Sequence, residues 1–390
     1  MVKDLIILGS TGSIGVSTLN IVRKNINKLQ VKLLSTNSNI NKILSQALEF
    51  KVKHVLIFNK EKYKSYKYLF NKNKIKVYFE LDDIVKLFNK KVFYTINAIS
   101  GISGLEPTLK IIKCTNNIAI ANKESIICGW KFIDRALKKN NTNFIPVDSE
   151  HFSIWSLLKN ENINNINKIY LTASGGPFLN KNINQIKNIK PKYALKHPNW
   201  SMGKKISIDS STMMNKIFEV IEAVKIFNLN INKFGIIIHP KSYIHAIVNF
   251  KTGLSKFLVH DTNMEIPIIN SIYYKNEEFE YFNKRFDFEK LNGLNFIKPN
   301  IKKFPLLKIL NMPIKNTYFE TILISVNDEL VKKYLNKEIN YISIQTILLK
   351  LIKDPYFTKY YKSTPRNLDD IKSMVNKVTN YMNKYIKYEK

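Results

Sequence analysis

Cysteine and arginine are both scarce in this 390-residue chain, which has two cysteines and only four arginines among its 62 basic residues. Two cysteines cannot form a framework of several disulfides, and they favour a reducing compartment. Nucleic-acid recognition leans on arginine, whose planar guanidinium binds a base edge or phosphate through two hydrogen bonds. The formal net charge of +32 therefore does not indicate a nucleic-acid-binding protein. Its lysines are spread through every segment, which we attribute to a strongly AT-biased genome.

Long apolar runs are also lacking, and we expect no leader segment. No run approaches the roughly 20 residues that a membrane-spanning helix needs. The first predicted strand, "LIILG", begins at residue 5, which leaves no room for a signal or transit peptide. Apolar residues nevertheless make up 45% of the chain, a fraction typical of folded proteins. We therefore expect a cytoplasmic protein with no membrane or nucleic-acid partner.

The order of the apolar segments predicts an α/β protein of three domains. Up to residue 150, short runs such as "LIILG", "VKLLST" and "NIAIAN" alternate with helix-length segments, as in a Rossmann-like, doubly wound parallel sheet. From 151 to 275 the predicted strands lie closer together, and "KTG" between the last two implies antiparallel pairing in an α+β catalytic domain. Residues 276–300 read as a connecting segment, and 301–390 as a C-terminal helical domain.

A glycine-rich turn follows the first predicted strand in "LIILGSTGSIGVSTLNIV". Its GxxGxxG spacing is a looser relative of the dinucleotide fingerprint, in which glycine lets the backbone approach a pyrophosphate at a helix start. An ordinary strand-to-helix loop is the alternative. The residues expected at the cofactor phosphates are Thr11, Gly12, Ser13 and Ile14.

The second predicted strand ends in "LLSTNSNI" and has no acidic residue there. Proteins that bind NAD commonly place an acid at this point to hold the ribose hydroxyls. Small polar side chains can accept a 2′-phosphate instead, which favours NADP. These cofactor-binding candidates are Asn37, Ser38 and Asn39.

Two carboxylates follow the apolar run "NFIPV" in "PVDSEH". Residues two apart on an extended segment point to the same face, so we expect Asp148 and Glu150 to converge. Two carboxylates that close repel each other unless a proton or a cation lies between them. The alternative is that Asp148 or Ser149 caps the following helix.

A helix predicted over 212–224 supplies a third carboxylate. It places Glu219 on the same side as Asn215 and Lys216, which are four and three residues away. Joined to Asp148 and Glu150, Glu219 would complete an all-oxygen site suited to Mg²⁺ or Mn²⁺. Donors for a phosphate monoester lie in the same block: Ser210, Asn215 and Lys216.

Three further side chains are candidates on weaker grounds. Ser174 stands before two glycines in "LTASGGPF", where exposed backbone N–H groups suit an anion, although a plain turn serine is as consistent. Lys123 follows the predicted strand "NIAIAN" at its carboxyl end, where ligands bind in open α/β sheets. Trp200 reads either as part of an apolar lid over the substrate or as buried packing.

The segments "GSTGSIG", "ANKES", "PVDSEH", "SGGPF", "HPNWSMGKKISIDSSTMMNK" and "HPKSYIHA" together resemble the 1-deoxy-D-xylulose 5-phosphate reductoisomerase family. The resemblance is ordered from residue 4 to about 250 and is weaker afterwards. It implies an enzyme that uses NADPH and Mg²⁺ or Mn²⁺ to form 2-C-methyl-D-erythritol 4-phosphate in the non-mevalonate isoprenoid pathway. In that mechanism, rearrangement of the metal-chelated ketose phosphate gives an aldehyde, which NADPH reduces. The resemblance also implies a homodimer.

The resemblance assigns roles to the matching positions. It implies that the cation is held by Asp148, Glu150 and Glu219, with Lys123 beside the reacting oxygens. The implied substrate-binding residues are Ser149, Glu150, Ser174, His197, Trp200, Ser210, Asn215, Lys216 and Glu219. The residues implied to face the nicotinamide nucleotide are Asn122, Glu124, Gly203 and the turn 11–14. Residues 197–203 would form a loop that closes over the substrate.

Some positions depart from the family pattern. Ser38 stands where the family commonly has a basic residue for the 2′-phosphate. Asn263 and Glu265 stand at the Asp and Arg positions of the usual Pro-Asp-Met-Arg segment, and "ISVNDE" (324–329) replaces Asn-Ala-Ala-Asn-Glu. These changes affect the support between domains, so we expect reduced stability. Because every predicted metal and phosphate ligand is present, we still expect an active enzyme.

Two other functions stay open on the residues alone. Another NADP-linked dehydrogenase of a phosphorylated aldehyde would share the glycine turn but would not need three carboxylates. A non-catalytic basic protein that keeps the fold would bind RNA or anionic lipid at a site independent of 148–219, with strong salt dependence.

Overall fold

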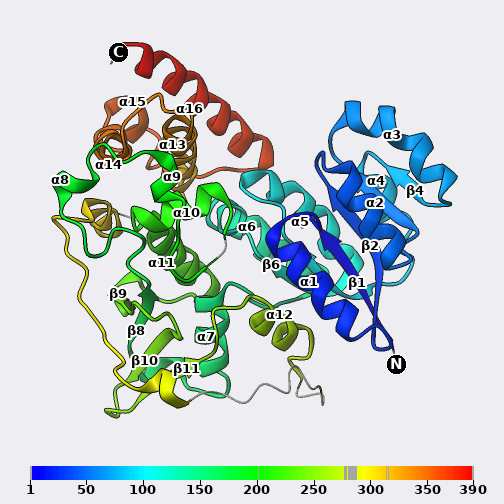
Figure 1. The fold of residues 1–390 in the computed structure, drawn as a ribbon, viewed down its shortest axis with the longest axis horizontal. Coiled ribbons are helices and arrows are strands. Elements are labelled where there is room, and N and C mark those ends of the chain that lie inside the picture. The colour runs from blue at the N-terminus through cyan, green and yellow to red at the C-terminus, as the bar shows by residue number, and fades with distance from the viewer. Residues whose placement is uncertain are drawn as a thin grey trace. The chain divides into compact units, whose positions relative to one another are not determined.

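A computed structural model of the protein describes residues 2–200, 202–275, 279, 288–312, 314 and 316–388. The chain forms two compact units, residues 1–152 with 263–284 and residues 153–262 with 285–390. Each unit has its own sheet (Figure 1). Within the described part of the chain, no helix has the length and apolar character needed to cross a bilayer.

The first unit is built on a parallel sheet of seven strands in the order β4-β3-β2-β1-β5-β6-β7. Most residues of its central strands are buried on both sides of the pleat, which explains why they read as continuous apolar runs. The predicted doubly wound fold is therefore confirmed. The strands are β1 (Lys3–Leu8), β2 (Leu29–Thr36), β3 (His54–Ile57), β4 (Lys76–Tyr78), β5 (Val92–Asn97), β6 (Thr115–Ile120) and β7 (Asn143–Phe144).

Helices connect these strands, because parallel neighbours need a crossover. The strand order reverses between β1 and β5, and the glycine turn after β1 lies at this switch point, where open sheets bind ligands. The helices of this unit are α1 (Ser13–Lys24), α2 (Ile40–Glu49), α3 (Lys60–Lys72), α4 (Leu81–Val85), α5 (Leu105–Ile111), α6 (Lys123–Lys139) and α12 (Glu265–Ile272). Helix α7 (Ser149–Leu157) runs from the first unit into the residues of the second.

The second unit holds a mixed sheet of four strands in the order β11-β10-β8-β9. Strands β10 and β11 pair antiparallel, as "KTG" predicted, and β8 pairs antiparallel with β10 but parallel with β9. Helix α11 covers the buried core of this sheet through Val220 and Ala223. The strands are β8 (Ile166–Ala173), β9 (Phe234–Ile238), β10 (Ile244–Phe250) and β11 (Ser255–Val259).

Helices make up the rest of the second unit, and those of the C-terminal part gather around α13 (Figure 1). They are α8 (Ile183–Ile186), α9 (Pro191–Ala194), α10 (Lys204–Ser211), α11 (Met214–Phe227), α13 (Tyr318–Leu335), α14 (Tyr341–Leu351), α15 (Pro355–Thr358) and α16 (Leu368–Tyr388). Short 3-10 turns are η1 (Ile102–Gly104) and η2 (Ile112–Cys114) in the first unit, and η3 (Ile163–Asn165), η4 (Ile231–Lys233), η5 (Phe288–Leu291) and η6 (Pro305–Asn311) in the second.

The two units divide the chain differently from the three expected domains. Residues 263–275, expected in the catalytic domain, belong to the first unit, and the helical residues 301–390 belong to the second. Most of 276–287, within the expected connecting segment 276–300, lies outside the described residues. The division into three functional domains stays a proposal.

Polar contacts explain why α12 joins the first unit. The carboxylate of Glu265 accepts from Asn20 Nδ2 at 3.0 Å and pairs with Lys24 Nζ at 3.1 Å, both on α1. The Oδ1 of Asn263 accepts from the N–H of Glu265 at 2.9 Å. Both residues that depart from the family pattern at 263 and 265 therefore have local partners.

Candidate functional site

The glycine turn has the backbone that the spacing predicted. Gly9 has a φ of 78°, and a Cβ on Gly15 would lie 2.4 Å from the Cα of Ser10, so neither position tolerates a side chain without backbone movement. Gly12 is the N-cap of α1, and no described side chain caps that helix start. The first N–H groups of α1 are thus available to an anion, and the turn fits a dinucleotide pyrophosphate.

The three residues after β2 are exposed, as a ribose-phosphate contact requires. Asn39 caps α2, because its Oδ1 accepts from the N–H of Lys42. The carbonyl of Asn37 accepts from the N–H of Asn59 at 3.1 Å, so the ends of β2 and β3 meet beside Ser38. The side chain of Ser38 offers one hydroxyl and no positive charge.

Lys123 and Asp148 form a pair inside the first unit. Lys123 is the first residue of α6, directly after the N-cap Asn122, and its side chain is buried rather than solvated. Its Nζ donates to Asp148 Oδ2, while Nδ1 of buried His151 lies 3.3 Å from Asp148 Oδ1. Burial alone would raise the pKa of the Asp148 carboxyl, but the charges of Lys123 and His151 outweigh it and hold that pKa well below its ordinary value. Asp148 is therefore an anion at neutral pH.

The expected extended geometry around Glu150 is wrong. Strand β7 ends at Phe144 and Ser149 begins α7, so Glu150 lies in the first turn of a helix. The physical reason is that a serine followed by an acid suits a helix start, where the carboxylate meets the positive end of the helix dipole. The N–H of Phe152 accordingly donates to the carbonyl of Asp148, and Ser149 Oγ donates to Glu150 Oε2.

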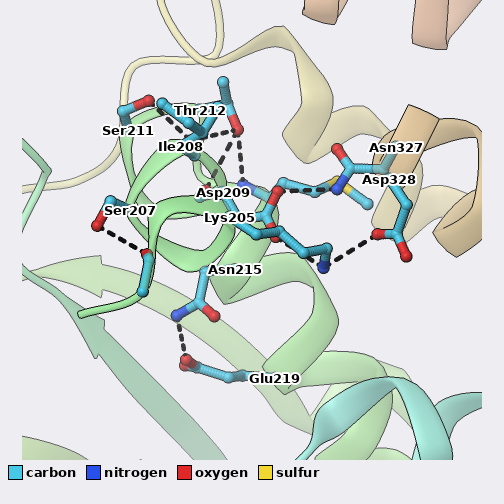
Figure 2. A network of polar contacts seen from close by, with 12 residues as sticks. Lys205, Ser207, Ile208, Asp209, Ser211, Thr212, Asn215, Glu219, Asn327 and Asp328 are labelled. Atoms are coloured by element: carbon cyan, nitrogen blue, oxygen red, sulfur yellow. Dashed lines mark hydrogen bonds and ion pairs between the residues drawn. The ribbon is translucent and has the colours of Figure 1, made fainter. Parts of the chain in front are cut away.

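The predicted shared side of Asn215, Lys216 and Glu219 is confirmed in the second unit. On α11, Asn215 Nδ2 donates to Glu219 Oε1 and Lys216 Nζ pairs with Glu219 Oε2, so the three side chains share one side of the helix. Figure 2 shows Asn215 pointing at Glu219. Lys216 and Glu219 are both buried. A carboxylate, an amide and an ammonium group thus lie within about one turn of one helix.

Ser174 and His197 form a hydrogen-bonded pair beyond the end of β8. Ser174 Oγ lies 3.0 Å from His197 Nε2 and accepts from the N–H of Gly176 at 3.1 Å. His197 Nδ1 accepts from the N–H groups of Asn199 and Trp200 at 3.2 and 3.0 Å. Burial and then the charge of Lys216 lower the pKa of the His197 imidazole to about 4. The neutral ring therefore carries its proton on Nε2 and donates it to Ser174.

The proton of Ser174 follows from this arrangement. Its oxygen already accepts two hydrogen bonds, one from His197 and one from Gly176, so its own O–H remains as a donor. Gly175 and Gly176 both have positive φ, at 83° and 69°. This turn presents a serine hydroxyl as a donor, which suits a phosphate oxygen.

The residues after His197 carry the predicted lid tryptophan. Trp200 is half-buried, and its ring packs edge-on against His245 with centroids 5.9 Å apart. Asn199 Nδ2 donates to the carbonyl of Pro240 and to Ser242 Oγ at 2.7 and 2.8 Å. Gly203 is the exposed N-cap of α10. Part of the tryptophan surface is therefore buried by packing, the alternative to a lid, and part is exposed.

Sequence reasoning missed two residues that hold candidate ligands in place. His151 touches Asp148 from three residues along the chain, a spacing that could have signalled the contact. Asp209 precedes Ser210 and pairs with Asn327, 118 residues away, for which the sequence gives no signal.

Comparison with known proteins gives one consistent result for the whole chain. Three family models match it: 1-deoxy-D-xylulose 5-phosphate reductoisomerase over residues 5–129, the 1-deoxy-D-xylulose 5-phosphate reductoisomerase C-terminal domain over 144–227, and the DXP reductoisomerase C-terminal domain over 260–381. The 1-deoxy-D-xylulose 5-phosphate reductoisomerase of Pelagibacter ubique is 52% identical over 375 residues, covering 95% of this chain and 96% of the relative. That of Sulfurihydrogenibium sp. is 37% identical, covering 96% of each.

Solved structures agree. A DOX-P reductoisomerase in complex with NADPH, fosmidomycin and magnesium superposes with a TM-score of 0.92 at 30% identity, covering 99% of this chain and 98% of that one. The 1-deoxy-D-xylulose 5-phosphate reductoisomerase of Zymomonas mobilis in complex with NADPH gives 0.87 at 29% identity, covering 99% of each.

Proposed function

The chain belongs to the 1-deoxy-D-xylulose 5-phosphate reductoisomerase family, and from that premise we propose how its own residues divide the work of the reaction. It is an NADPH- and divalent-metal-dependent enzyme that rearranges and reduces 1-deoxy-D-xylulose 5-phosphate to 2-C-methyl-D-erythritol 4-phosphate. The observation that carries the residue assignment is the single turn of α11 that joins Glu219 to Asn215 and Lys216. A metal ligand and two phosphate donors on one turn suit a substrate that is both chelated and phosphorylated.

Asp148, Glu150 and Glu219 are the proposed ligands of the cation. All three are carboxylates, the oxygen donors that Mg²⁺ and Mn²⁺ prefer, and Asp148 is held ionised by Lys123 and His151. When bound, a divalent cation supplies a Lewis acid that stabilises negative charge on substrate oxygens. Lys123, fixed by its pair with Asp148, adds a positive charge beside the same oxygens. Ser149, hydrogen-bonded to Glu150, is proposed to contact the substrate as well.

The phosphate of the substrate is proposed to bind in the second unit. Ser174 and Ser210 offer hydroxyls, and Asn215 and Lys216 offer an amide and an ammonium group. Neutral His197 keeps the Ser174 proton directed away from itself, as its hydrogen bonds require. Trp200 is proposed to cover the bound substrate and exclude water.

NADPH fits two features of the first unit. The glycine turn, with Thr11, Ser13 and Ile14, would hold the pyrophosphate at the start of α1. Asn122 Oδ1 is buried and has no hydrogen-bond partner among the described residues, which leaves an acceptor for an amide group. Bound there, the cofactor supplies the hydride, and Asn122, Glu124 and Gly203 are proposed to face its nicotinamide end. Asn37, Ser38 and Asn39 are proposed to contact its 2′-phosphate.

We also propose that the enzyme is a cytoplasmic homodimer. Strand β11 is an edge of the four-stranded sheet; its Phe257 is 48% exposed, and Leu254, one residue before the strand, is 64% exposed. An exposed apolar edge strand pairs readily with another strand, so a second copy of the chain is a fitting partner. Two cysteines in 390 residues suit a reducing compartment.

The direct test is incubation of the purified protein with 1-deoxy-D-xylulose 5-phosphate, NADPH and Mg²⁺. We expect a product two mass units heavier than the substrate, formed as NADPH is oxidised. Chelation of the metal should stop NADPH oxidation, and added Mg²⁺ should restore it. Oxidation that survives thorough chelation would instead support a metal-independent dehydrogenase.

A further inference from the structure

The corner between α10 and α11 carries the proposed phosphate donors on one side. Ser210 lies near the end of α10, and Asn215 lies at the start of α11; both are half-buried. Between them Met213 is buried and has a φ of 64°, a left-handed conformation that is unfavourable for a residue with a side chain. Such a backbone persists only where its surroundings fix it. Contacts with other parts of the chain must therefore stabilise the backbone of this corner.

Asp209, the neighbour of Ser210, provides the first hold. Its side chain is 2% exposed and bonds to residues other than the proposed phosphate donors. Asn327 Nδ2 on α13 donates to its Oδ1 at 2.8 Å, and Lys205 Nζ on α10 pairs with its Oδ2 at 3.1 Å (Figure 2). A buried carboxylate is tolerated only with such partners. The contact ties the end of α10 to a helix more than a hundred residues away.

Lys205 joins a second residue of α13 to the same network. Its Nζ lies 3.0 Å from Asp328 Oδ1, and Asp328 directly follows Asn327 (Figure 2). Two consecutive residues of α13 thus contact α10: Asn327 through its amide group and Asp328 through its ion pair with Lys205. This geometry fixes the rotation of α10 about its own axis, and so the direction in which Ser210 points.

Tyr341 on α14 holds the last residue of α10. Its hydroxyl donates to the carbonyl of Ser211 at 2.8 Å, and its fully buried ring packs edge-on against Phe178 and Tyr334. The turn that follows Ser174 also lies against Ser211, since a Cβ on Gly176 would lie 3.1 Å from the Cα of Ser211. The corner therefore contacts both the C-terminal helices and the turn that carries Ser174.

We propose that Asp209, Asn327 and Tyr341 are positioning residues for the phosphate of the substrate. They do not contact it, but they fix the corner so that Ser210, Asn215 and Lys216 converge before binding. Preorganisation of this kind removes an ordering cost from binding, so it acts on substrate affinity. The inference rests on the proposed function, which places the phosphate at these donors. It gives α13 and α14 a part in substrate recognition.

The test compares Tyr341→Phe with Tyr361→Phe. Both changes delete one hydroxyl that donates to a backbone carbonyl, that of Ser211 in one case and that of Ile352 in the other. We expect Tyr341→Phe to raise KM for 1-deoxy-D-xylulose 5-phosphate by roughly three- to tenfold, in proportion to one lost hydrogen bond. KM for NADPH should stay unchanged, and Tyr361→Phe should leave both constants unchanged. A wild-type KM for the substrate in Tyr341→Phe would overturn the proposal.

A second pair of variants tests Asp209 by rescue. Asn327→Asp places two carboxylates face to face, and their repulsion should raise KM for the substrate more than Tyr341→Phe does. Adding Asp209→Asn restores a carboxylate–amide hydrogen bond with the roles exchanged, and KM should return most of the way. A double variant no better than the single one would contradict a positioning role. Turnover by the wild-type protein is measured in the same assay, so its absence would refute the proposed function and not this inference.

Discussion

Ser38, a proposed contact of the NADPH 2′-phosphate, stands where the family commonly has a basic residue. It is exposed at the end of β2, where a basic side chain would pair with a 2′-phosphate. Ser38→Arg should therefore lower KM for NADPH by roughly tenfold through a charge-assisted hydrogen bond, with little effect on NADH. Ser65→Arg, exposed on α3, adds the same charge elsewhere in the same unit and serves as the control. If Ser38→Arg lowered KM for NADPH and for NADH equally, Ser38 would not be a contact of the 2′-phosphate.

His197 is the residue whose protonation the structure constrains. Lys216→Met removes the smaller of the two causes that lower its pKa, so the pKa should rise above about 4 while staying below 6.5, because burial remains. An NMR titration of the imidazole measures this directly. A pKa that is unchanged or lower in Lys216→Met would show that the ammonium group does not act on the ring.

The same ring makes stability depend on pH. Its folded pKa lies below the ordinary value of about 6.5, so the unfolded chain takes up the proton first as the pH falls. The contribution of His197 to the free energy of unfolding is therefore complete above pH 6.5 and decreases between about 6.5 and 4. His197→Asn should flatten the pH dependence of the urea midpoint in this window, and an unaltered slope would contradict the burial of a neutral ring.

At the scale of elements, the start of α1 is the feature most dependent on glycine. Gly15→Ala would push a Cβ against the backbone of Ser10 at 2.4 Å and of Gly9 at 2.5 Å, which cannot move without opening the turn. We expect a loss of roughly 1–3 kcal/mol in the free energy of unfolding and a weaker Kd for NADPH. Gly129→Ala is the control for a crowded glycine outside the turn, because the atoms nearest to its Cβ belong to the side chain of Leu105 and not to backbone. Wild-type NADPH affinity in Gly15→Ala would contradict the assignment of this turn.

The elements also show what could be predicted from the sequence. The glycine turn spans residues 9–15, and Asn215, Lys216 and Glu219 lie within four residues of each other, so local spacing predicted both. The expectation for Glu150 was wrong for a local reason too, since Ser149 begins a helix where an extended segment was expected. The contact of Asp209 with Asn327 was out of reach, because only the folded chain brings α10 and α13 together.

Positions that depart from the family pattern have polar partners in the structure. Glu265 stands where an arginine is usual, yet it pairs with Lys24 and accepts from Asn20, and Asn327 and Asp328 hold α10. These substitutions are accommodated by partners within their own unit. A reduced stability, expected from the sequence, stays a prediction.

At the scale of the whole molecule, the proposed dimer can be tested through its edge strand. Phe257→Lys places a charge on the exposed face of β11, a substitution that blocks pairing of edge strands. Sedimentation velocity should show a dimer for the wild-type protein and a larger monomer fraction for the variant. Phe288→Lys, which changes a phenylalanine that is 76% exposed outside any strand, should leave the dimer intact. A wild-type distribution for Phe257→Lys would place the interface elsewhere.

We propose that one divalent cation is shared by Asp148, Glu150 and Glu219. The most direct test of this proposal is a calorimetric titration of Mn²⁺ into the wild-type protein, Glu219→Gln and the control Glu329→Gln on α13. We expect one Mn²⁺ site in the wild-type protein and the control, and an affinity weakened by roughly 100-fold or more in Glu219→Gln, with turnover lost and NADPH affinity kept. Unchanged Mn²⁺ affinity in Glu219→Gln would contradict the proposal.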